Sequence, residues 1–400
     1  MSGLQLPALR LKKNEDRRLR AGHLWVFSNE VDIAATPLTA FAPGDPVIIE
    51  AADGKPLGSG YVNPHALICA RLVSRDPRYV LDQSLLIHRF NIALSLRQRL
   101  FADDYYRLAF GDSDGLPGLV VDRYGDVFVV QIATAGMERV KPEIVTALEK
   151  VFKPRAILMR NDTNSRDMEG LNRYIETAAG EVPEQIILEE NGAKFVIPFT
   201  EGQKTGWFYD QRINRTRMRQ YVAGKRVLDV FSYIGAWGVQ AACAGAQAVL
   251  CVDSSQKAPA WMRHNAEINN VLEKLTITQA DAFEVLKSLR AEREKFDVVI
   301  VDPPAFIKRK KDVKEGAQAY RRLNQMAMQV LAADGILISS SCSYHLERAA
   351  LLGILLQTSR HLDRNLQIIE EGHQAPDHPV HPAIPETAYL KTYFARVLPV

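Results

Sequence analysis

The C-terminal half of this 400-residue chain predicts a doubly wound α/β fold, in which helices cover both faces of a mostly parallel sheet. From about residue 200, apolar runs typical of buried strands alternate with stretches of helical spacing. A closing strand pair, 366–370 and 389–397, follows them, and the last strand can run antiparallel. The earlier strands are expected at 226–230, 249–253, 276–279, 296–301 and 335–340, with the clearest helices at 257–270 and 283–294.

Two other parts precede this half. Residues 1–75 contain short apolar runs punctuated by Gly and Pro and show no long helical period, which predicts a small β-rich module. Residues 76–190 predict an α+β domain with helices at 85–100 and near 138–152. Asn191-Gly192 is a strong hairpin signal, and this hairpin leads into the third domain, residues 191–400.

The composition favours a globular cytoplasmic protein. Hydrophobic residues make up 47% and charged residues 24%, and the formal net charge of +3 does not by itself indicate a polyanionic partner. No apolar run is long enough for a membrane span, and no secretory signal is recognisable. We expect no membrane partner, and the oligomeric state stays open, with a homodimer as one alternative.

The cysteines do not predict a metal or a disulfide framework. The sequence has four, Cys69, Cys243, Cys251 and Cys342, and none of them forms a C-x-x-C pair. We therefore expect free thiols and no metal. The first three are interpreted as core residues.

Acidic residues at the ends of three successive strands predict a cofactor site. Asp229 closes the first strand before a glycine-containing turn, where its carboxylate suits the ammonium group of S-adenosylmethionine better than a pyrophosphate. The G-x-G-x-x-G pattern of nicotinamide enzymes is absent. Each acid taken alone has an alternative role as a helix N-cap. The expected cofactor contacts are Asp229, Phe231, Tyr233, Gly235, Asp253, Asp281, Ala282, Phe283 and Asp302.

The segment after the fourth strand, D-P-P-A-F, predicts a rigid loop that binds a planar nitrogenous substrate. Asp302 can accept a hydrogen bond from a nucleobase amino group, and Phe306 can stack on the ring. A prolyl loop that merely ends a strand is the alternative. Four cations follow and suit phosphate contacts, although such a run is also typical of a solvated surface. The expected substrate contacts are Pro303, Pro304, Phe306, Lys308, Arg309, Lys310 and Lys311.

Cys342 follows the fifth strand and is a candidate nucleophile. A thiolate that adds to carbon 6 of a pyrimidine makes carbon 5 nucleophilic enough to accept a methyl group. His345 and Arg348 are close in sequence and could favour the thiolate. Cysteine is also common in buried strands, so a purely structural role stays open.

Together these motifs resemble the bacterial 23S ribosomal RNA cytosine-5 methyltransferase I family over nearly the whole chain. The resemblance rests on K-T-G-W-F-Y-D-Q-R at 204–212, D-V-F-S-Y-I-G-A-W-G at 229–238, D-P-P-A-F at 302–306 and S-C-S at 341–343, with G-D-S-D-G-L-P-G-L-V-V-D-R-Y at 111–124. It implies an RNA-binding PUA module for 1–75, a central α+β domain, and a class I (Rossmann-like) methyltransferase domain that uses S-adenosylmethionine.

The resemblance also implies cytosine carbon 5 of 23S ribosomal RNA as the acceptor and Cys342 as the catalytic nucleophile. The neighbouring ends of the fourth and fifth strands place Cys342 beside Asp302, which is the second expected catalytic residue and orients the base. D-P-P-x-F also occurs in related enzymes that methylate other base positions. Two alternatives therefore remain: methyl transfer to a guanine or adenine nitrogen, and a non-catalytic RNA-binding assembly factor.

Overall fold

The computed structural model describes residues 6–199 and 202–400, which form two compact units. Unit 1 contains the chain up to Ile186 together with Pro198–Tyr209 and Pro376–Thr387. Unit 2 contains Ile187–Ile197, Asp210–Ala375 and Ala388–Val400. The chain therefore passes between the units several times.

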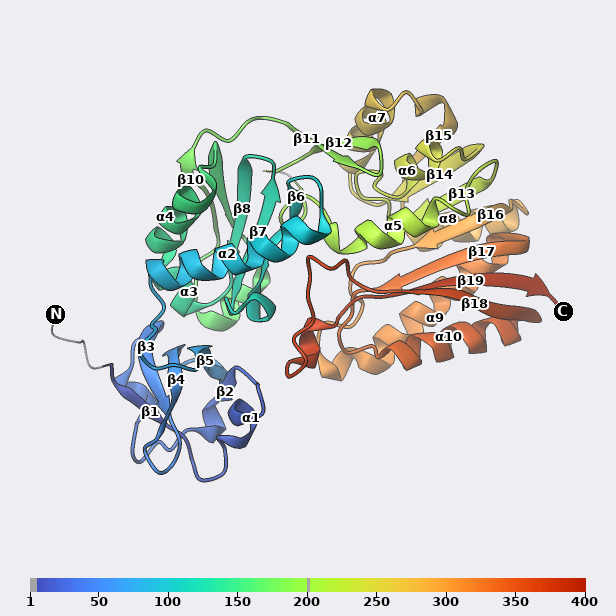
Figure 1. Ribbon diagram of the computed structural model, residues 1–400. Helices are drawn as coiled ribbons and strands as arrows, with labels where there is room; N and C mark the ends of the chain where they lie inside the picture. Colours follow the sequence, from blue (N-terminus) through green and yellow to red (C-terminus); the bar gives the residue numbers. More distant parts are fainter. Residues whose placement is uncertain (1–5, 200–201) are drawn as a thin grey trace. The chain divides into compact units, whose positions relative to one another are not determined.

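The first sheet of unit 1 is small and five-stranded, with the order β1-β3-β4-β5-β2 (Figure 1). Short apolar runs bounded by turns form it, as the sequence predicts, and its inner face buries Leu9, Val26, Val47 and Leu72. Among residues 6–75, which the structure describes, the only α-helix is the single turn α1 (Arg17–Arg20). The strands are β1 (Ala8–Arg10), β2 (Trp25–Phe27), β3 (Asp45–Glu50), β4 (Pro56–Val62) and β5 (Ile68–Ser74).

The second sheet of unit 1 has the order β10-β9-β8-β7-β6 and packs against α2 and α4. A single helix was expected near 138–152, but the chain forms α3 and α4 on either side of Val140, because Pro142 suits the first turn of a new helix. The elements are α2 (Gln83–Leu100), β6 (Tyr105–Phe110), β7 (Leu119–Tyr124), β8 (Val127–Ile132), α3 (Ala135–Arg139), α4 (Lys141–Phe152), β9 (Ala156–Asn161) and β10 (Tyr174–Gly180).

Unit 2 is built on a seven-stranded sheet with the order β15-β14-β13-β16-β17-β19-β18. The first five strands in this order are parallel, while β19 runs antiparallel to both of its neighbours. This is the predicted doubly wound α/β fold. Its strands are β13 (Arg226–Val230), β14 (Ala248–Asp253), β15 (Leu275–Gln279), β16 (Phe296–Val301), β17 (Leu331–Ser341), β18 (Arg364–Gly372) and β19 (Lys391–Pro399).

Helices cover this sheet on both faces (Figure 1). α8, α9 and α10 share one apolar core with the sheet, and α7 packs with the hairpin formed by β11 (Ile186–Glu190) and β12 (Ala193–Ile197). Asn191 and Gly192 both have positive φ, which the predicted two-residue turn requires. The helices are α5 (Arg212–Met218), α6 (Gly238–Cys243), α7 (Ala258–Ile268), α8 (Ala282–Ala291), α9 (Val313–Val330) and α10 (Arg348–His361).

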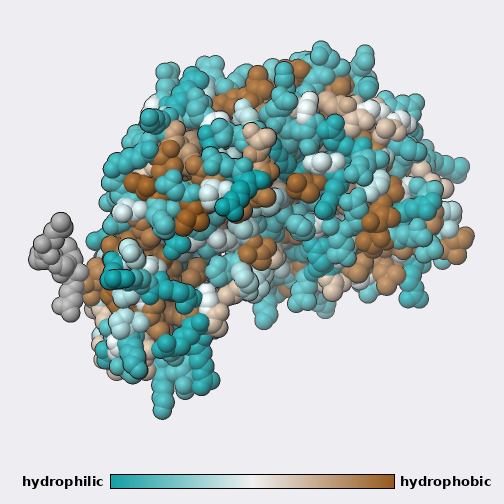
Figure 2. All heavy atoms as spheres, in the orientation of Figure 1, coloured by the Kyte–Doolittle hydropathy of each residue, from teal (hydrophilic) through white to brown (hydrophobic). Residues whose placement is uncertain are grey.

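Two of these helices end earlier than expected. Asn270 and Arg293 adopt positive φ just after α7 and α8, a left-handed conformation that terminates a helix. Within the described ranges, no helix has the length and apolar character needed to cross a membrane. On the face drawn in Figure 2, apolar side chains form separate patches on a largely hydrophilic surface.

Candidate active site

The predicted site residues of unit 2 meet at the carboxyl edge of the parallel sheet. Asp253 is the last residue of β14, Asp302 directly follows β16, and Cys342 directly follows β17. The strand order reverses beside β13, so the ends of β13 and β16 flank the switch point at which such sheets bind ligands.

Asp229 in β13 offers a buried acceptor at this switch point. Its Oδ2 accepts the backbone N–H of Gly238 at 2.9 Å, and its Oδ1 has no hydrogen-bond partner among the described residues. Burial raises the pKa of Asp229 to about 7. A buried carboxylate with a free oxygen fits the ammonium group of S-adenosylmethionine, which would supply both the missing hydrogen bond and the missing countercharge.

The turn after β13 is held in an unusual backbone conformation. Phe231, Tyr233 and Gly235 have φ values of 70°, 53° and 87°. Side-chain-bearing residues rarely adopt this region, and such strain gathers at ligand sites. Tyr233 donates its backbone N–H to Oδ2 of Asp253 at 2.9 Å, so the acid of β14 also fixes the turn.

Two of the other predicted cofactor acids, Asp253 and Asp281, also have structural partners. Oδ1 of Asp253 accepts the N–H of Ser255 at 2.9 Å. Asp281 is exposed and caps α8, accepting the N–H groups of Phe283 and Glu284. A carboxylate has about four acceptor positions, so these bonds leave both acids able to bind hydroxyl or amino groups. Ala282 is buried, and Phe283 packs partly against the core.

Asp302 is held by two side-chain donors. Oδ1 accepts from Nε2 of Gln211 and Oδ2 accepts from Nε1 of Trp237, both at 3.0 Å. Burial raises the pKa of Asp302 to about 6. The carboxylate is therefore oriented, and it is mostly ionised above neutral pH.

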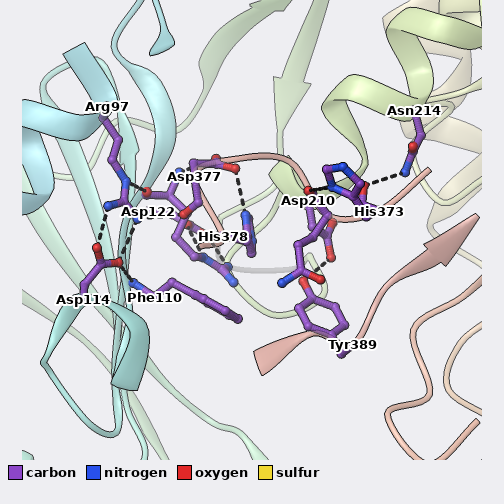
Figure 3. A network of polar contacts seen from close by, with 12 residues as sticks. Arg97, Phe110, Asp114, Asp122, Asp210, Asn214, His373, Asp377, His378 and Tyr389 are labelled. Carbon is purple, nitrogen blue, oxygen red and sulfur yellow. Dashed lines mark hydrogen bonds and ion pairs between the residues drawn. The ribbon is translucent and has the colours of Figure 1, made fainter. Parts of the chain in front are cut away.

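Neighbouring polar contacts fix the donor Gln211. Asn214 donates to Oε1 of Gln211 at 2.7 Å. It also donates to the carbonyl of His373 at 3.2 Å (Figure 3). Beside them, the Tyr389 hydroxyl donates to Oδ2 of Asp210 at 2.5 Å (Figure 3). The start of α5 is thereby tied to the C-terminal strands of the same unit.

Cys342 lies against the prolyl loop. Its Sγ is 3.9 Å from the carbonyl oxygen of Pro303, and the side chain is partly exposed. The two strand ends therefore lie side by side, as the sequence predicts. Pro304 is exposed, whereas Phe306 packs against Tyr320 with ring centroids 4.8 Å apart.

The cations that follow this loop are exposed. They are Lys308, Arg309, Lys310 and Lys311, and Arg309 forms an ion pair with Asp312 at 3.2 Å. The loop beneath them is anchored, because Ile307 is buried and donates its N–H to Oγ of Ser343 at 3.1 Å.

Sequence reasoning missed the partners of Asp302. Trp237 and Gln211 lie inside quoted motifs, but no spacing rule connects them with the fourth strand. The motif at 204–212 is also divided, since Lys204–Tyr209 belongs to unit 1 while Gln211 and Arg212 belong to unit 2.

Comparison with known proteins agrees with this geometry. Residues 9–75 match the PUA-like domain family, and residues 166–395 match the S-adenosylmethionine-dependent methyltransferase family. A relative from Aliivibrio fischeri called ribosomal RNA large subunit methyltransferase I is 37% identical over 97% of this chain and 98% of its own length. Its namesake from Klebsiella pneumoniae is 36% identical, and the match covers 100% of both chains.

Solved structures share the fold. One from Streptococcus mutans, described as a SAM-dependent methyltransferase, has a TM-score of 0.82 at 22% identity and covers 98% of this chain and 100% of its own. Another methyltransferase, complexed with SAH, has a TM-score of 0.84 at 22% identity with the same coverage. The chain thus combines a PUA-like domain with a class I methyltransferase domain that uses S-adenosylmethionine, and it belongs to the methyltransferase family that includes the relatives called ribosomal RNA large subunit methyltransferase I.

Proposed function

We propose that this protein methylates carbon 5 of a specific cytosine in 23S ribosomal RNA through a transient covalent bond between Cys342 and carbon 6. The observation that carries the proposal is the position of Cys342, whose Sγ lies 3.9 Å from the carbonyl of Pro303 in the loop that also presents Asp302. The names of the relatives and the PUA-like domain support ribosomal RNA as the substrate.

Cytosine needs this cysteine because its carbon 5 is a weak nucleophile. The Cys342 thiolate forms a bond to carbon 6, and the electron pair of the C5–C6 double bond becomes available at carbon 5. S-adenosylmethionine supplies an electrophilic methyl group on a sulfonium, so carbon 5 gains the methyl and the sulfonium keeps the bonding pair. Loss of the carbon-5 proton to a base then restores the double bond and expels the thiolate.

Asp302 has the role of orienting the base. Gln211 and Trp237 occupy one acceptor position on each of its oxygens, which leaves positions for the exocyclic amino group of cytosine. Its ionised form, favoured above about pH 6, is the form that accepts this hydrogen bond.

The RNA must present the cytosine outside a stacked helix, because stacking shields carbon 6. Lys308, Arg309, Lys310 and Lys311 are exposed next to the prolyl loop and can contact phosphates on either side of the target. Phosphate contacts of this kind position an RNA but do not select its sequence.

The first test is a covalent trap. Ribosomal RNA containing 5-fluorocytosine is incubated with S-adenosylmethionine and the full-length protein, and the products are separated on a denaturing gel. Fluorine does not leave as a proton does, so a protein–RNA adduct accumulates with the unaltered protein. Cys342→Ala is expected to abolish the adduct, while Cys243→Ala, the other partly exposed cysteine, retains it.

Two other results would redirect the proposal. Methylated RNA without any adduct would indicate transfer to a guanine or adenine nitrogen, and nucleoside analysis of the product would identify the atom. RNA binding without S-adenosylmethionine binding would indicate an assembly factor with no methyltransferase activity.

A further inference from the structure

A buried lysine lies beside the candidate nucleophile. Lys391 is the first residue of β19, and it pairs with Ser341 of β17 in the antiparallel register. Because β19 runs against β17, its first residue is placed at the carboxyl edge of the parallel strands. The residue is only 5% exposed.

The Lys391 ammonium group reaches the residue that follows Cys342. Its Nζ donates to the carbonyl oxygen of Ser343 at 2.6 Å. The backbone partner Ser341 and this carbonyl acceptor flank Cys342 on both sides in sequence. Lys391 thus contacts the residue before Cys342, through backbone pairing, and the residue after it, through its ammonium group.

No carboxylate compensates the charge of Lys391 in the part of the chain that the structure describes. The groups that act on it electrostatically are Cys342 and Arg348. Burial lowers the pKa of Lys391 to about 8, and the negative charge of the Cys342 thiolate opposes this shift. A buried ammonium without a countercharge is unfavourable, so the position is poorly explained by stability alone.

The other groups near this pair do not replace Lys391. Arg348 of α10 donates to the carbonyl of Gly372 at 2.8 Å and pairs with Glu371 at 3.5 Å. Tyr320 of α9 contacts Oγ of Ser343, and burial raises its pKa, so its hydroxyl is neutral at neutral pH.

At the other three cysteines, burial outweighs the effect of nearby cations, which are Arg71 for Cys69 and Arg219 and Lys274 for Cys243. Burial raises the pKa of Cys69 to about 12, and it raises the pKa of Cys251 and Cys243 as well. These thiols are protonated at neutral pH. Cys342 lies beside a buried cation that has no acidic partner.

We propose that Lys391 is a positioning residue whose ammonium group holds Cys342 as a thiolate before RNA binds. The thiol proton passes to solvent, and the resulting thiolate and the Lys391 ammonium form an ion pair. This assignment rests on the proposed function for its purpose, because covalent attack on carbon 6 requires a thiolate. The ion pair itself needs neither RNA nor methyl transfer.

The test is the pH profile of Cys342 alkylation. Full-length protein is treated with iodoacetamide between about pH 5 and 10, a range that includes the ordinary pKa of a thiol. Modification of each cysteine is followed by peptide mass spectrometry. An opposite charge a few ångströms away shifts a pKa by about one to three units. Lys391→Met should therefore slow alkylation of Cys342 at neutral pH by at least about tenfold and move its midpoint upward.

Two further variants separate charge from packing. Lys391→Arg retains a cation and should recover part of the lost reactivity. Lys295→Met is the control for loss of a lysine charge. Lys295 is exposed, donates its ammonium to the carbonyl of Gln329 at 2.7 Å, and precedes β16 at the opposite edge of the sheet. The Lys295→Met substitution should leave the Cys342 profile unchanged. An unaltered profile in a folded Lys391→Met protein overturns the proposal.

A reciprocal measurement covers the case in which Lys391→Met does not fold. In Cys342→Ala the thiolate is absent, so the amine of Lys391 should lose its proton at lower pH and react faster with an amine-specific acylating reagent. Equal reactivity of Lys391 in both proteins would exclude the ion pair. If the alkylation profile of Cys342 depends on Lys391 but the 5-fluorocytosine trap gives no adduct, the result would contradict cytosine methylation and would leave the ion pair supported.

Discussion

At the scale of single residues, the candidate site contains two acids whose pKa is raised by burial. Asp229 has an unsatisfied oxygen, and burial raises its pKa to about 7, while the pKa of Asp302 is raised to about 6. In each case the folded chain binds a proton that the unfolded chain has already released. The free energy of unfolding therefore falls as the pH rises from the ordinary pKa of an aspartate to about 7, because the folded chain must then ionise these acids in a buried position.

Asp229→Asn should separate stability from ligand binding. The amide keeps an acceptor for Gly238 but loses the charge, so at pH 8 the thermal midpoint without ligand should be equal or higher. The charge-assisted hydrogen bond to S-adenosylmethionine is lost, about 1.5–3 kcal/mol, which weakens binding roughly 10- to 100-fold. Affinity of the unaltered protein should decline as the pH falls through about 7, because the ligand selects the ionised form.

Calorimetric titration with S-adenosylmethionine at pH 6 and pH 8 measures both effects. Asp297→Asn is the control, because Asp297 accepts the backbone N–H of Arg226 at 2.8 Å near the amino end of the sheet. Binding to Asp229→Asn as tight as to the unaltered protein would remove Asp229 from the cofactor site.

Single residues were predictable from the sequence where a strand places them. Asp253, Asp302 and Cys342 occur directly at strand ends, so the strand pattern alone brings them to one edge. Lys391 was not predictable, because its position beside Cys342 depends on the antiparallel pairing of a strand about fifty residues later in the chain. Local periodicity contains no information about such a pairing.

At the scale of elements, the loop after β16 is positioned by the end of β17. Ser343 is 1% exposed, and its Oγ accepts the N–H of Ile307 at 3.1 Å and contacts the hydroxyl of Tyr320 at 2.9 Å. One side chain thus joins the prolyl loop, the cysteine segment and α9. The sequence predicts the strands on both sides but does not reveal this link.

Ser343→Ala should loosen the prolyl loop. Two buried polar groups lose a partner, which costs about 1–3 kcal/mol and is measurable by urea unfolding. Because Asp302 and Cys342 then sample more positions, the rate of methyl transfer in a single turnover should fall, while S-adenosylmethionine binding changes little.

The matched control is Ser359→Ala. Ser359 is also 1% exposed, but its Oγ donates only to the carbonyl of Leu356 one turn earlier in α10. Equal methylation rates in the two variants would show that Ser343 contributes to stability alone.

At the scale of the whole molecule, the sequence predicts the class of each part better than the path of the chain. The doubly wound sheet and the β-rich module follow from periodicity and turn residues. Pro376–Thr387 nevertheless belongs to unit 1, where Arg97 donates to the carbonyl of Asp377 at 2.7 Å (Figure 3). A contact over 280 residues depends on tertiary structure, which a local pattern does not encode.

Within unit 1, Glu169 joins the two five-stranded sheets. This buried carboxylate accepts from Nη1 of Arg71 at 2.8 Å and from Nδ2 of Asn63 at 2.7 Å, both on the side of the PUA-like domain. It also accepts the N–H of Ala135, at the start of α3, at 3.3 Å. Glu169 is therefore one of the contacts that orient the PUA-like domain on the second sheet, together with the hydrogen bonds from Trp25 to Asp112 and from Tyr61 to the carbonyl of Pro117.

Glu169→Ala should release this connection without affecting the cofactor site. The substitution leaves the largely buried guanidinium of Arg71 without its countercharge, a loss of about 3–5 kcal/mol that limited proteolysis and thermal unfolding can detect. S-adenosylmethionine binding should be unchanged, because its predicted contacts all lie in unit 2. The KM for ribosomal RNA should rise, because RNA bound to the PUA-like domain is no longer presented in one orientation.

Asp167→Ala, which removes an exposed ion pair with Arg173 from the same segment, should change none of these quantities. An unchanged KM in a measurably destabilised Glu169→Ala protein would mean that the RNA is positioned by the methyltransferase domain alone.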